Sequence, residues 1–265
     1  MDKPDFVKGE LEEALAAINS LIGKCEKAFA KLTCGTSQHT LMKRRLAAFL
    51  LSVALILREM NKKIKIYHFT KKENLESILE HGLRPDTKFL TLGSKLREGA
   101  VYFWSNPGED EMGYIGNKNY VCLEVNIDAS RCFVASMDII SAAFVNFVKA
   151  KTGEALWDYQ KLAGLYDSEA MPYSSYTPGH FRVPEIIVQG VVAPAFISAV
   201  EAEFATPVKS NREIYNERLR GKLATDIDEM EKQGLVEKIA IHDDSTGLLA
   251  SYFWRDSGEF FTVEL

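Results

Sequence analysis

The sequence predicts an α+β protein, and three changes of pattern along the chain support that prediction. Up to residue 62, apolar side chains recur at three- and four-residue steps, which is typical of amphipathic helices. From residue 63 the pattern changes to short strand-like runs, short helices and turns. After residue 209 a charged helix-like stretch precedes three further strand-like runs. We therefore expect a helical segment at 1–62, an α+β core at 63–208 and an extension at 209–265.

The N-terminal segment is predicted to be a hairpin of two antiparallel helices. Its first helix carries apolar residues along one face, and a break at 33–37 separates it from a second helix at 41–60. The apolar positions of the first helix are Phe6, Leu11, Leu15, Ile18, Leu21 and Ile22.

The core segment begins with an alternating strand at 64–69, after which Thr70 is expected to cap a short helix that stops at Gly82. Further strands are expected at 99–104, 120–127 and 185–192, and a helical stretch at 137–166. The stretch 171–179 has too many turn-forming residues for regular structure.

The extension is expected to hold one charged helix, from about 211 to 233, followed by strands at 236–241, 248–254 and 260–265. Turn residues separate these three runs, so they predict a β-meander.

Composition and charge limit the class of protein. The chain has 265 residues, of which 46% are hydrophobic and 26% charged, as in ordinary globular proteins. Its four cysteines form no C-x-x-C pair and predict buried thiols in a reducing compartment. No apolar leader is visible, and the apolar run at 46–57 is shorter than the roughly 20 residues that span a bilayer. We expect a cytoplasmic protein with no membrane partner.

The net charge of -5 argues against a uniformly basic surface for nucleic acids. Charge is uneven, however, because residues 38–100 hold thirteen basic and six acidic side chains, a surplus of seven. That surplus fits either a solvated helix face or the neighbourhood of an anionic ligand.

Several common catalytic motifs are absent. The sequence contains no G-x-G-x-x-G after a strand, no G-x-x-x-x-G-K-[ST], no H-E-x-x-H and no G-x-S-x-G. Dinucleotide-binding Rossmann folds, P-loop enzymes, zinc proteases and α/β-hydrolases therefore receive no support.

Three residues at strand ends remain as candidates. His68 precedes a helix, Tyr102 lies in an aromatic run, and Glu185 begins an apolar strand. Taken singly, His68 and Tyr102 are more often core residues than functional ones. A carboxylate at the head of a buried strand is either exposed at the edge or held there for a purpose.

Taken together, the blocks around these residues resemble a known superfamily. The first reads Tyr67-His68-Phe69-Thr70 and continues through 74–83, the second covers 99–105 with Tyr114 further on, and the third is 184–192. In this order they resemble the ADP-ribosyltransferase superfamily of the H-Y-E type. Their residue strings are similar to those of the DarT-type transferases that modify single-stranded DNA. The resemblance covers roughly 64–205 and implies a split mixed β-sheet core.

The resemblance implies NAD as co-substrate, with no metal. It makes Glu185, Tyr102 and His68 the catalytic residues. NAD would contact His68, Phe69, Thr70, Tyr102, Ser105 and Tyr114. An enzyme that breaks the nicotinamide–ribose bond needs an aromatic face and a carboxylate that favours an oxocarbenium-like centre, which agrees with these residue types.

The acceptor is expected to be a nucleic acid. Arginine-modifying relatives carry Glu or Gln two positions before the catalytic Glu, whereas this chain has Val183. The preceding loop offers aromatic and basic groups suited to an extruded base, namely Tyr173, Tyr176, His180, Phe181 and Arg182, although a packed surface loop would look similar.

The resemblance thus predicts a mono-ADP-ribosyltransferase that modifies single-stranded DNA or RNA, as a bacterial toxin with a possible antitoxin or as part of phage defence. Two alternatives stay open: a protein acceptor, and a catalytically inactive module that binds a nucleotide or a partner.

Overall fold

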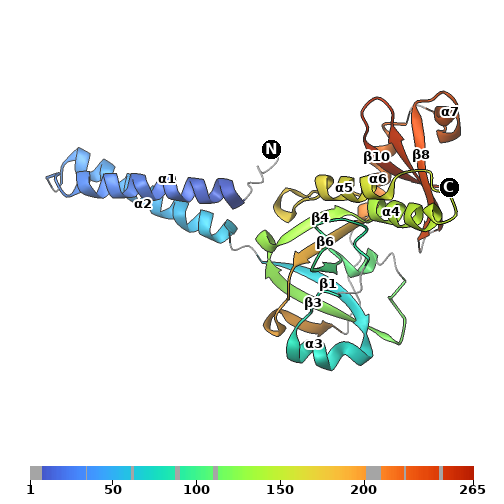
Figure 1. Ribbon diagram of the computed structural model, residues 1–265. Coiled ribbons are helices and arrows are strands. Elements are labelled where there is room, and N and C mark those ends of the chain that lie inside the picture. Colours follow the sequence, from blue (N-terminus) through green and yellow to red (C-terminus); the bar gives the residue numbers. More distant parts are fainter. Residues whose placement is uncertain are drawn as a thin grey trace. The chain divides into compact units, whose positions relative to one another are not determined.

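The computed structural model describes residues 8–33, 35–60, 63–86, 90–109, 113–200, 210–223, 225–244 and 247–265. The chain divides into two compact units, Met1–Lys63 with Asp128–Ser130 and Ile64–Ile127 with Arg131–Leu265. Both helices and strands are present, which confirms the α+β class (Figure 1).

The first unit contains the predicted helical hairpin. Helix α1 spans Lys8–Phe29 and α2 spans Ser37–Met60, and the two pack side by side (Figure 1). Helix α2 begins at Ser37 rather than at residue 41, because Thr36 accepts a hydrogen bond from the backbone N–H of His39 (3.2 Å) and so supplies an earlier cap.

Two antiparallel sheets form the core of the second unit. One has the order β1-β3-β7, with β1 at Lys63–Lys71, β3 at Tyr120–Asp128 and β7 at Ile197–Val200. The other has the order β2-β6-β4-β5, with β2 at Ala100–Phe103, β6 at Pro184–Gln189, β4 at Cys132–Ser136 and β5 at Met171–Pro172.

All these strand pairs are antiparallel, so the mixed sheet expected from the resemblance is wrong. The strand pairs β2–β6, β4–β6, β4–β5 and β3–β7 run antiparallel. Strand β1 also runs antiparallel to β3, because Lys72 pairs with Asn119 at one end while Lys65 pairs with Glu124 further on. The two sheets meet where Tyr67 and Trp104 exchange backbone hydrogen bonds of 2.9 and 2.7 Å.

The helix after β1 differs from the prediction at its start. Helix α3 spans Leu75–His81, and Thr70 does not cap it, because β1 and the 3-10 turn Lys72–Asn74 separate Thr70 from it. The predicted stop at Gly82 is confirmed. Gly82 has φ 83°, and a Cβ there would lie 2.2 Å from the carbonyl oxygen of Val192, so the close approach of the two chains requires glycine.

Two stretches predicted as single helices are each divided. Helix α4 spans Met137–Ala150 and α5 spans Tyr159–Glu169, where one helix over 137–166 was expected. Asp158 starts α5 by accepting from two backbone N–H groups. The charged stretch likewise forms α6 at Asn211–Arg220 and α7 at Ile227–Lys232, because Asp226 caps a new helix.

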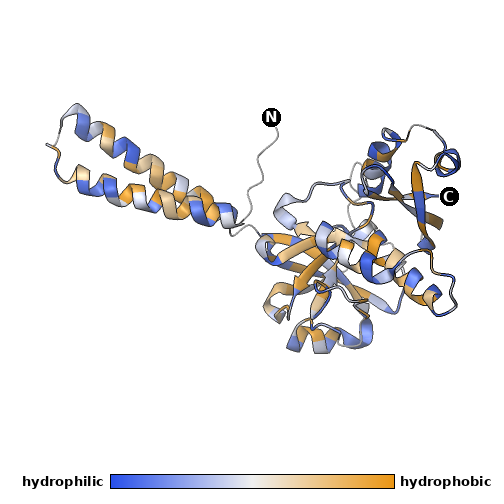
Figure 2. Cartoon of the chain, turned by 45° about the horizontal axis from the view of Figure 1, so that its top comes forward, coloured by the Kyte–Doolittle hydropathy of each residue, from blue (hydrophilic) through white to orange (hydrophobic). Residues whose placement is uncertain are grey.

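The predicted C-terminal β-meander is confirmed. Strands β8 (Val236–Asp244), β9 (Gly247–Trp254) and β10 (Phe260–Glu264) form an antiparallel sheet in the order β10-β9-β8. Strand β8 packs against α4, where Asn146 donates a hydrogen bond to the carbonyl of Ile239 (3.1 Å). One apolar cluster joins residues of α4, α5 and β8 to the sheet that contains β6, and hydrophobic residues predominate along its strands (Figure 2).

Candidate active site

Glu185 lies in the middle of the four-stranded sheet. It is the second residue of β6, where β4 pairs on one side and β2 on the other, and it faces Ala135 in the register with β4. The residue is 9% exposed. A carboxylate buried this far needs strong hydrogen-bond donors.

Two donors meet on one oxygen of that carboxylate. Arg97 forms an ion pair with Glu185 Oε2 through Nη1, and the Tyr166 hydroxyl donates to the same oxygen over 2.6 Å. Arg97 also donates to the Tyr166 hydroxyl (3.1 Å), which closes a triangle of three side chains. The hydrogen bonds that the described residues make to Glu185 both end on Oε2, so Oε1 is left for other contacts.

The charges in this triangle are fixed by its surroundings. Burial raises the pKa of the Tyr166 hydroxyl well above its ordinary value, and the Glu185 carboxylate raises it further. Burial by itself would lower the pKa of Arg97, but Glu185 and the two tyrosines outweigh it and raise the pKa. Tyr166 therefore remains a donor and Arg97 remains a cation.

Helix α5 also holds the loop that carries Arg97. The carboxylate of Asp167 accepts from the Ser94 hydroxyl (2.5 Å) and from the backbone N–H groups of Lys95 (2.8 Å) and Leu96 (3.3 Å). Ser94 in turn accepts from the backbone N–H of Arg97 (3.2 Å). Adjacent residues of α5, Tyr166 and Asp167, thus fix both the side chain and the backbone of Arg97.

Tyr102 covers Arg97 from the neighbouring strand β2. The guanidinium carbon of Arg97 lies 4.2 Å from the centre of the Tyr102 ring, a cation–π distance. The Tyr102 hydroxyl donates to the backbone carbonyl of Arg97 (3.0 Å), and burial raises its pKa to about 12 although Arg97 opposes the shift. One face of the Tyr102 ring is therefore occupied by a cation that also binds Glu185.

His68 is fixed by the backbone of Tyr102. Its Nδ1 lies 2.8 Å from the carbonyl oxygen of Tyr102, and because a carbonyl only accepts, Nδ1 carries the proton. Burial lowers the pKa of His68 despite this hydrogen bond, so the ring is neutral near pH 7 and Nε2 has a lone pair to accept with.

His68, Tyr102 and Glu185 line one cavity of about 220 Å³. Its walls are His68, Phe69, Tyr102, Phe103, Trp104, Tyr114, Met137 and Glu185. Five of the predicted site residues are thus brought together. A second cavity of about 480 Å³ is lined by His68 and Tyr102 again, together with Thr70 and residues of 74–86.

The remaining predicted residues lie elsewhere. Ser105, Tyr173, Tyr176 and Phe181 line neither of these two cavities. Phe181 is buried and stacks on Tyr176, whose hydroxyl donates to Asn211 of α6 (2.7 Å). The aromatic loop therefore packs against the C-terminal extension. This arrangement agrees with the alternative interpretation of the loop as a packed surface loop.

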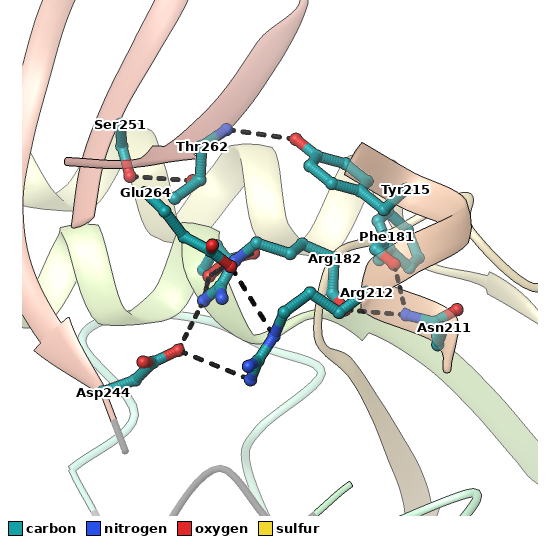
Figure 3. Close-up of polar contacts among 10 residues, drawn as sticks. Phe181, Arg182, Asn211, Arg212, Tyr215, Asp244, Ser251, Thr262 and Glu264 are labelled. Atoms are coloured by element: carbon teal, nitrogen blue, oxygen red, sulfur yellow. Dashed lines mark hydrogen bonds and ion pairs between the residues drawn. The ribbon is translucent and has the colours of Figure 1, made fainter. Parts of the chain in front are cut away.

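Arg182 occupies a buried ion-pair cluster (Figure 3). It is 2% exposed and binds Asp138 of α4 through Nε and Nη2, the shortest distance being 2.6 Å. It also binds Asp244 at the end of β8 (2.9 Å). These contacts favour a structural role for Arg182 over the substrate contact that the sequence suggests. Its guanidinium is buried and already forms ion pairs with two carboxylates, Asp138 and Asp244.

Arg97, Tyr166 and Asp167 were not predicted from the sequence. Arg97 is 88 positions from Glu185, and no motif links them. The available signal was physical: a carboxylate in a buried strand requires a buried cation, and Arg97 lies just before the aromatic strand that pairs with β6.

Within the described ranges, no group of three or more His, Cys, Asp and Glu side chains is arranged to hold a metal ion. The helices in the same ranges include none that combines the length and apolarity needed to cross a membrane. Comparisons with protein-family models, with curated proteins and with solved structures found no match for this chain.

Proposed function

We propose that this protein is an NAD-dependent mono-ADP-ribosyltransferase that modifies a nucleic acid. One observation carries the proposal: His68, Tyr102 and Glu185, which come from three strands, line one small aromatic cavity. A residue that only fills the core would be apolar, whereas Glu185 is a carboxylate held in the cavity wall by Arg97 and Tyr166. The division of the core into two sheets joined at Tyr67 and Trp104 agrees with the split that the resemblance implies, although the strands are antiparallel rather than mixed.

The two cavities suit a dinucleotide in size and chemistry. The smaller one is mostly aromatic and holds one carboxylate, which fits a nicotinamide and the ribose beside it. The larger one shares His68 and Tyr102 with it and adds Asn74, Ser77 and the exposed Arg84, which are groups that bind hydroxyls and phosphate. Together they lie in the size range of small-molecule sites.

The proposed reaction uses the geometry around Glu185. Bound NAD supplies a glycosidic bond whose nicotinamide leaves readily. Because Arg97 and Tyr166 both bind Oε2, the second oxygen Oε1 would accept from a ribose hydroxyl and stabilise positive charge at the anomeric carbon. The Nε2 lone pair of His68 would accept from a second hydroxyl, and the face of Tyr102 away from Arg97 would contact the nicotinamide ring.

The residue two positions before Glu185 supports an acceptor other than arginine. Val183 is buried, and its backbone carbonyl accepts from the backbone N–H of Met137 (2.9 Å). An apolar side chain there supplies no second carboxylate to orient a guanidinium acceptor.

Transfer of label from NAD tests the proposal. We expect the protein to transfer labelled ADP-ribose to single-stranded DNA or RNA, and Glu185→Gln to reduce transfer by about a hundredfold or more because the amide has no charge. Glu124→Gln on β3, whose side chain lines neither cavity, is the matched control. Label that survives nuclease but not protease would move the proposal to a protein acceptor. Absence of both NAD binding and nicotinamide release would favour the inactive module.

A further inference from the structure

The end of the hairpin at which α1 and α2 are joined concentrates positive charge. Residues 24–45 hold six basic side chains and one acidic one, Glu26. Because α1 and α2 pack side by side and a short turn joins them, all of these residues lie at one end of the hairpin, which we call the tip (Figure 1). The basic residues of the tip are Lys24, Lys27, Lys31, Lys43, Arg44 and Arg45.

The charge of the tip is not neutralised by carboxylates of the same chain. All six basic residues are exposed, and among the described residues none of them forms an ion pair. Residues 1–63 hold eleven basic and seven acidic side chains, whereas 64–265 hold 21 basic and 30 acidic ones. The tip is therefore a cationic surface on a chain that is otherwise acidic.

The electrostatics of the two helices account for only part of this pattern. A basic residue in the last turn of a helix interacts favourably with the helix dipole, and Lys27 of α1 is in that position. Helix α2 has no acidic residue in its first turn, although negative side chains are the ones that stabilise a helix start, and three consecutive cations follow at 43–45. Six like charges at one end repel one another, and a bound polyanion would remove that repulsion.

The uncharged residues of the tip also suit phosphate groups. Thr33, Ser37 and Gln38 are exposed, and hydroxyl and amide side chains share most protein contacts to nucleic-acid phosphates with lysine and arginine. Phe29 and His39 are partly buried and stack on each other, with 4.5 Å between the ring centres. The tip therefore offers charge and hydrogen bonds rather than an open aromatic surface for bases.

From these observations we infer that the tip binds the sugar–phosphate backbone of a nucleic acid, without preference for base sequence. An anionic membrane fits less well, because surfaces that bind it insert several apolar side chains among their cations. Within the described part of 24–45, Leu41 is the one large apolar residue that is exposed, and the exposed leucines of α2 at 50–57 begin more than a turn beyond Arg45. That the bound strand is the acceptor rests on the proposed function, whereas the binding itself does not.

Binding measured without NAD tests the inference. The probe is labelled single-stranded DNA of mixed sequence, about 40 nucleotides long, followed by fluorescence anisotropy at several salt concentrations. If all six cations contact phosphates, the logarithm of the binding constant should fall with the logarithm of salt concentration with a slope of about -4. Lys43→Glu, Arg44→Glu and Arg45→Glu together, the tip variant, should reduce that slope by about two and weaken binding about tenfold or more.

A matched variant removes the same charge from the second unit. Lys161→Glu, Arg220→Glu and Lys232→Glu together change three exposed residues outside the hairpin, and they should leave the slope and the affinity as in the original chain. Glutamate is a good helix former and suits the first half of α2, so the tip variant should keep its helices, which circular dichroism checks. A folded tip variant that binds as tightly as the matched variant would overturn the inference. So would an original chain that binds phosphatidylserine vesicles but not the strand.

Transfer assays separate this inference from the proposed function. Glu185→Gln should bind the strand as the original chain does while losing transfer. The tip variant should release nicotinamide from NAD at the original rate, whereas its KM for the strand should rise with little change in kcat, because the tip serves binding alone. Binding through the tip without any transfer would support the inference and refute the proposed function. Transfer with an unchanged KM in the tip variant would show that the acceptor does not use the tip.

Discussion

At the scale of single residues, the two carboxylate oxygens of Glu185 have different surroundings. Arg97 and Tyr166 hold Oε2, and Oε1 remains for a ligand in the cavity. Arg97 also lies under the ring of Tyr102, so one guanidinium orients both the carboxylate and the aromatic face of the candidate site. We regard it as a positioning residue.

Replacing Arg97 tests that role. We expect Arg97→Ala to lower kcat for ADP-ribosyl transfer by about a hundredfold while KM for NAD changes little, because a misplaced carboxylate harms the transition state most. Arg97→Lys should recover part of the loss, since the charge returns without the planar fork. The exposed Arg255→Ala serves as the control. A change in KM with unchanged kcat would show that Arg97 serves binding instead.

Tyr166 should contribute less than Arg97. Tyr166→Phe removes the 2.6 Å hydrogen bond to Glu185 but leaves the ring in place beneath the sheet. We expect kcat to fall about tenfold and the melting temperature to fall by several degrees, because a buried hydrogen bond to a charged group contributes about 1.5–3 kcal/mol to stability. Steady-state kinetics and a melting curve check both parts, and full activity in the folded variant would remove Tyr166 from the site.

At the scale of the elements, strand β8 carries a buried histidine whose pKa links stability to pH. His242 is buried, and neither ring nitrogen has a hydrogen-bond partner among the described residues. Burial lowers its pKa; Asp138 opposes the shift, and Arg182 adds to it. The unfolded chain, with an ordinary histidine pKa near 6.5, therefore takes up a proton first as the pH falls.

The stability that comes from a neutral His242 should be complete above about pH 6.5 and should decrease below it. We expect the free energy of unfolding, measured with denaturant at pH 7.5 and 5.5, to decrease less in His242→Leu than in the original chain. Part of the decrease should remain, because burial also lowers the pKa of His68. An identical decrease in the variant and the original chain would show that His242 is not responsible.

The elements differ in how far sequence alone could predict them. The hairpin and the meander were predicted because apolar periodicity and turn residues are local signals. Strands β4 and β7 were missed because they are short and their partners are distant in the sequence. His68, Tyr102 and Glu185 could be proposed as site residues from their local blocks, whereas the contact of Arg97 with Glu185 is one that only the fold creates.

At the scale of the whole molecule, the C-terminal extension and the core are joined by buried polar contacts (Figure 3). Arg182 binds Asp138 of the core and Asp244 of β8, while Asn211 of α6 donates to the backbone carbonyls of Phe181 and Arg182 (2.7 Å each). Arg212 adds longer ion pairs to Asp244 (3.9 Å) and Glu264 (4.0 Å). The strand that begins at Pro184 directly follows this cluster, so the extension supports the position of Glu185.

A chain ending at residue 208 should therefore fail to fold. It would lose Asp244 from Arg182 and the carbonyl of Ile239 from Asn146, and it would uncover the apolar residues of α4 that pack on β8. Breaking a buried ion pair costs about 3 kcal/mol or more by itself, which is a large part of the stability of most domains. A chain of residues 63–265 should fold, because its unit keeps all of these contacts. Circular dichroism and cooperative melting compare the two, and a stable, cooperatively melting 1–208 chain would mean that the extension only rests on the core.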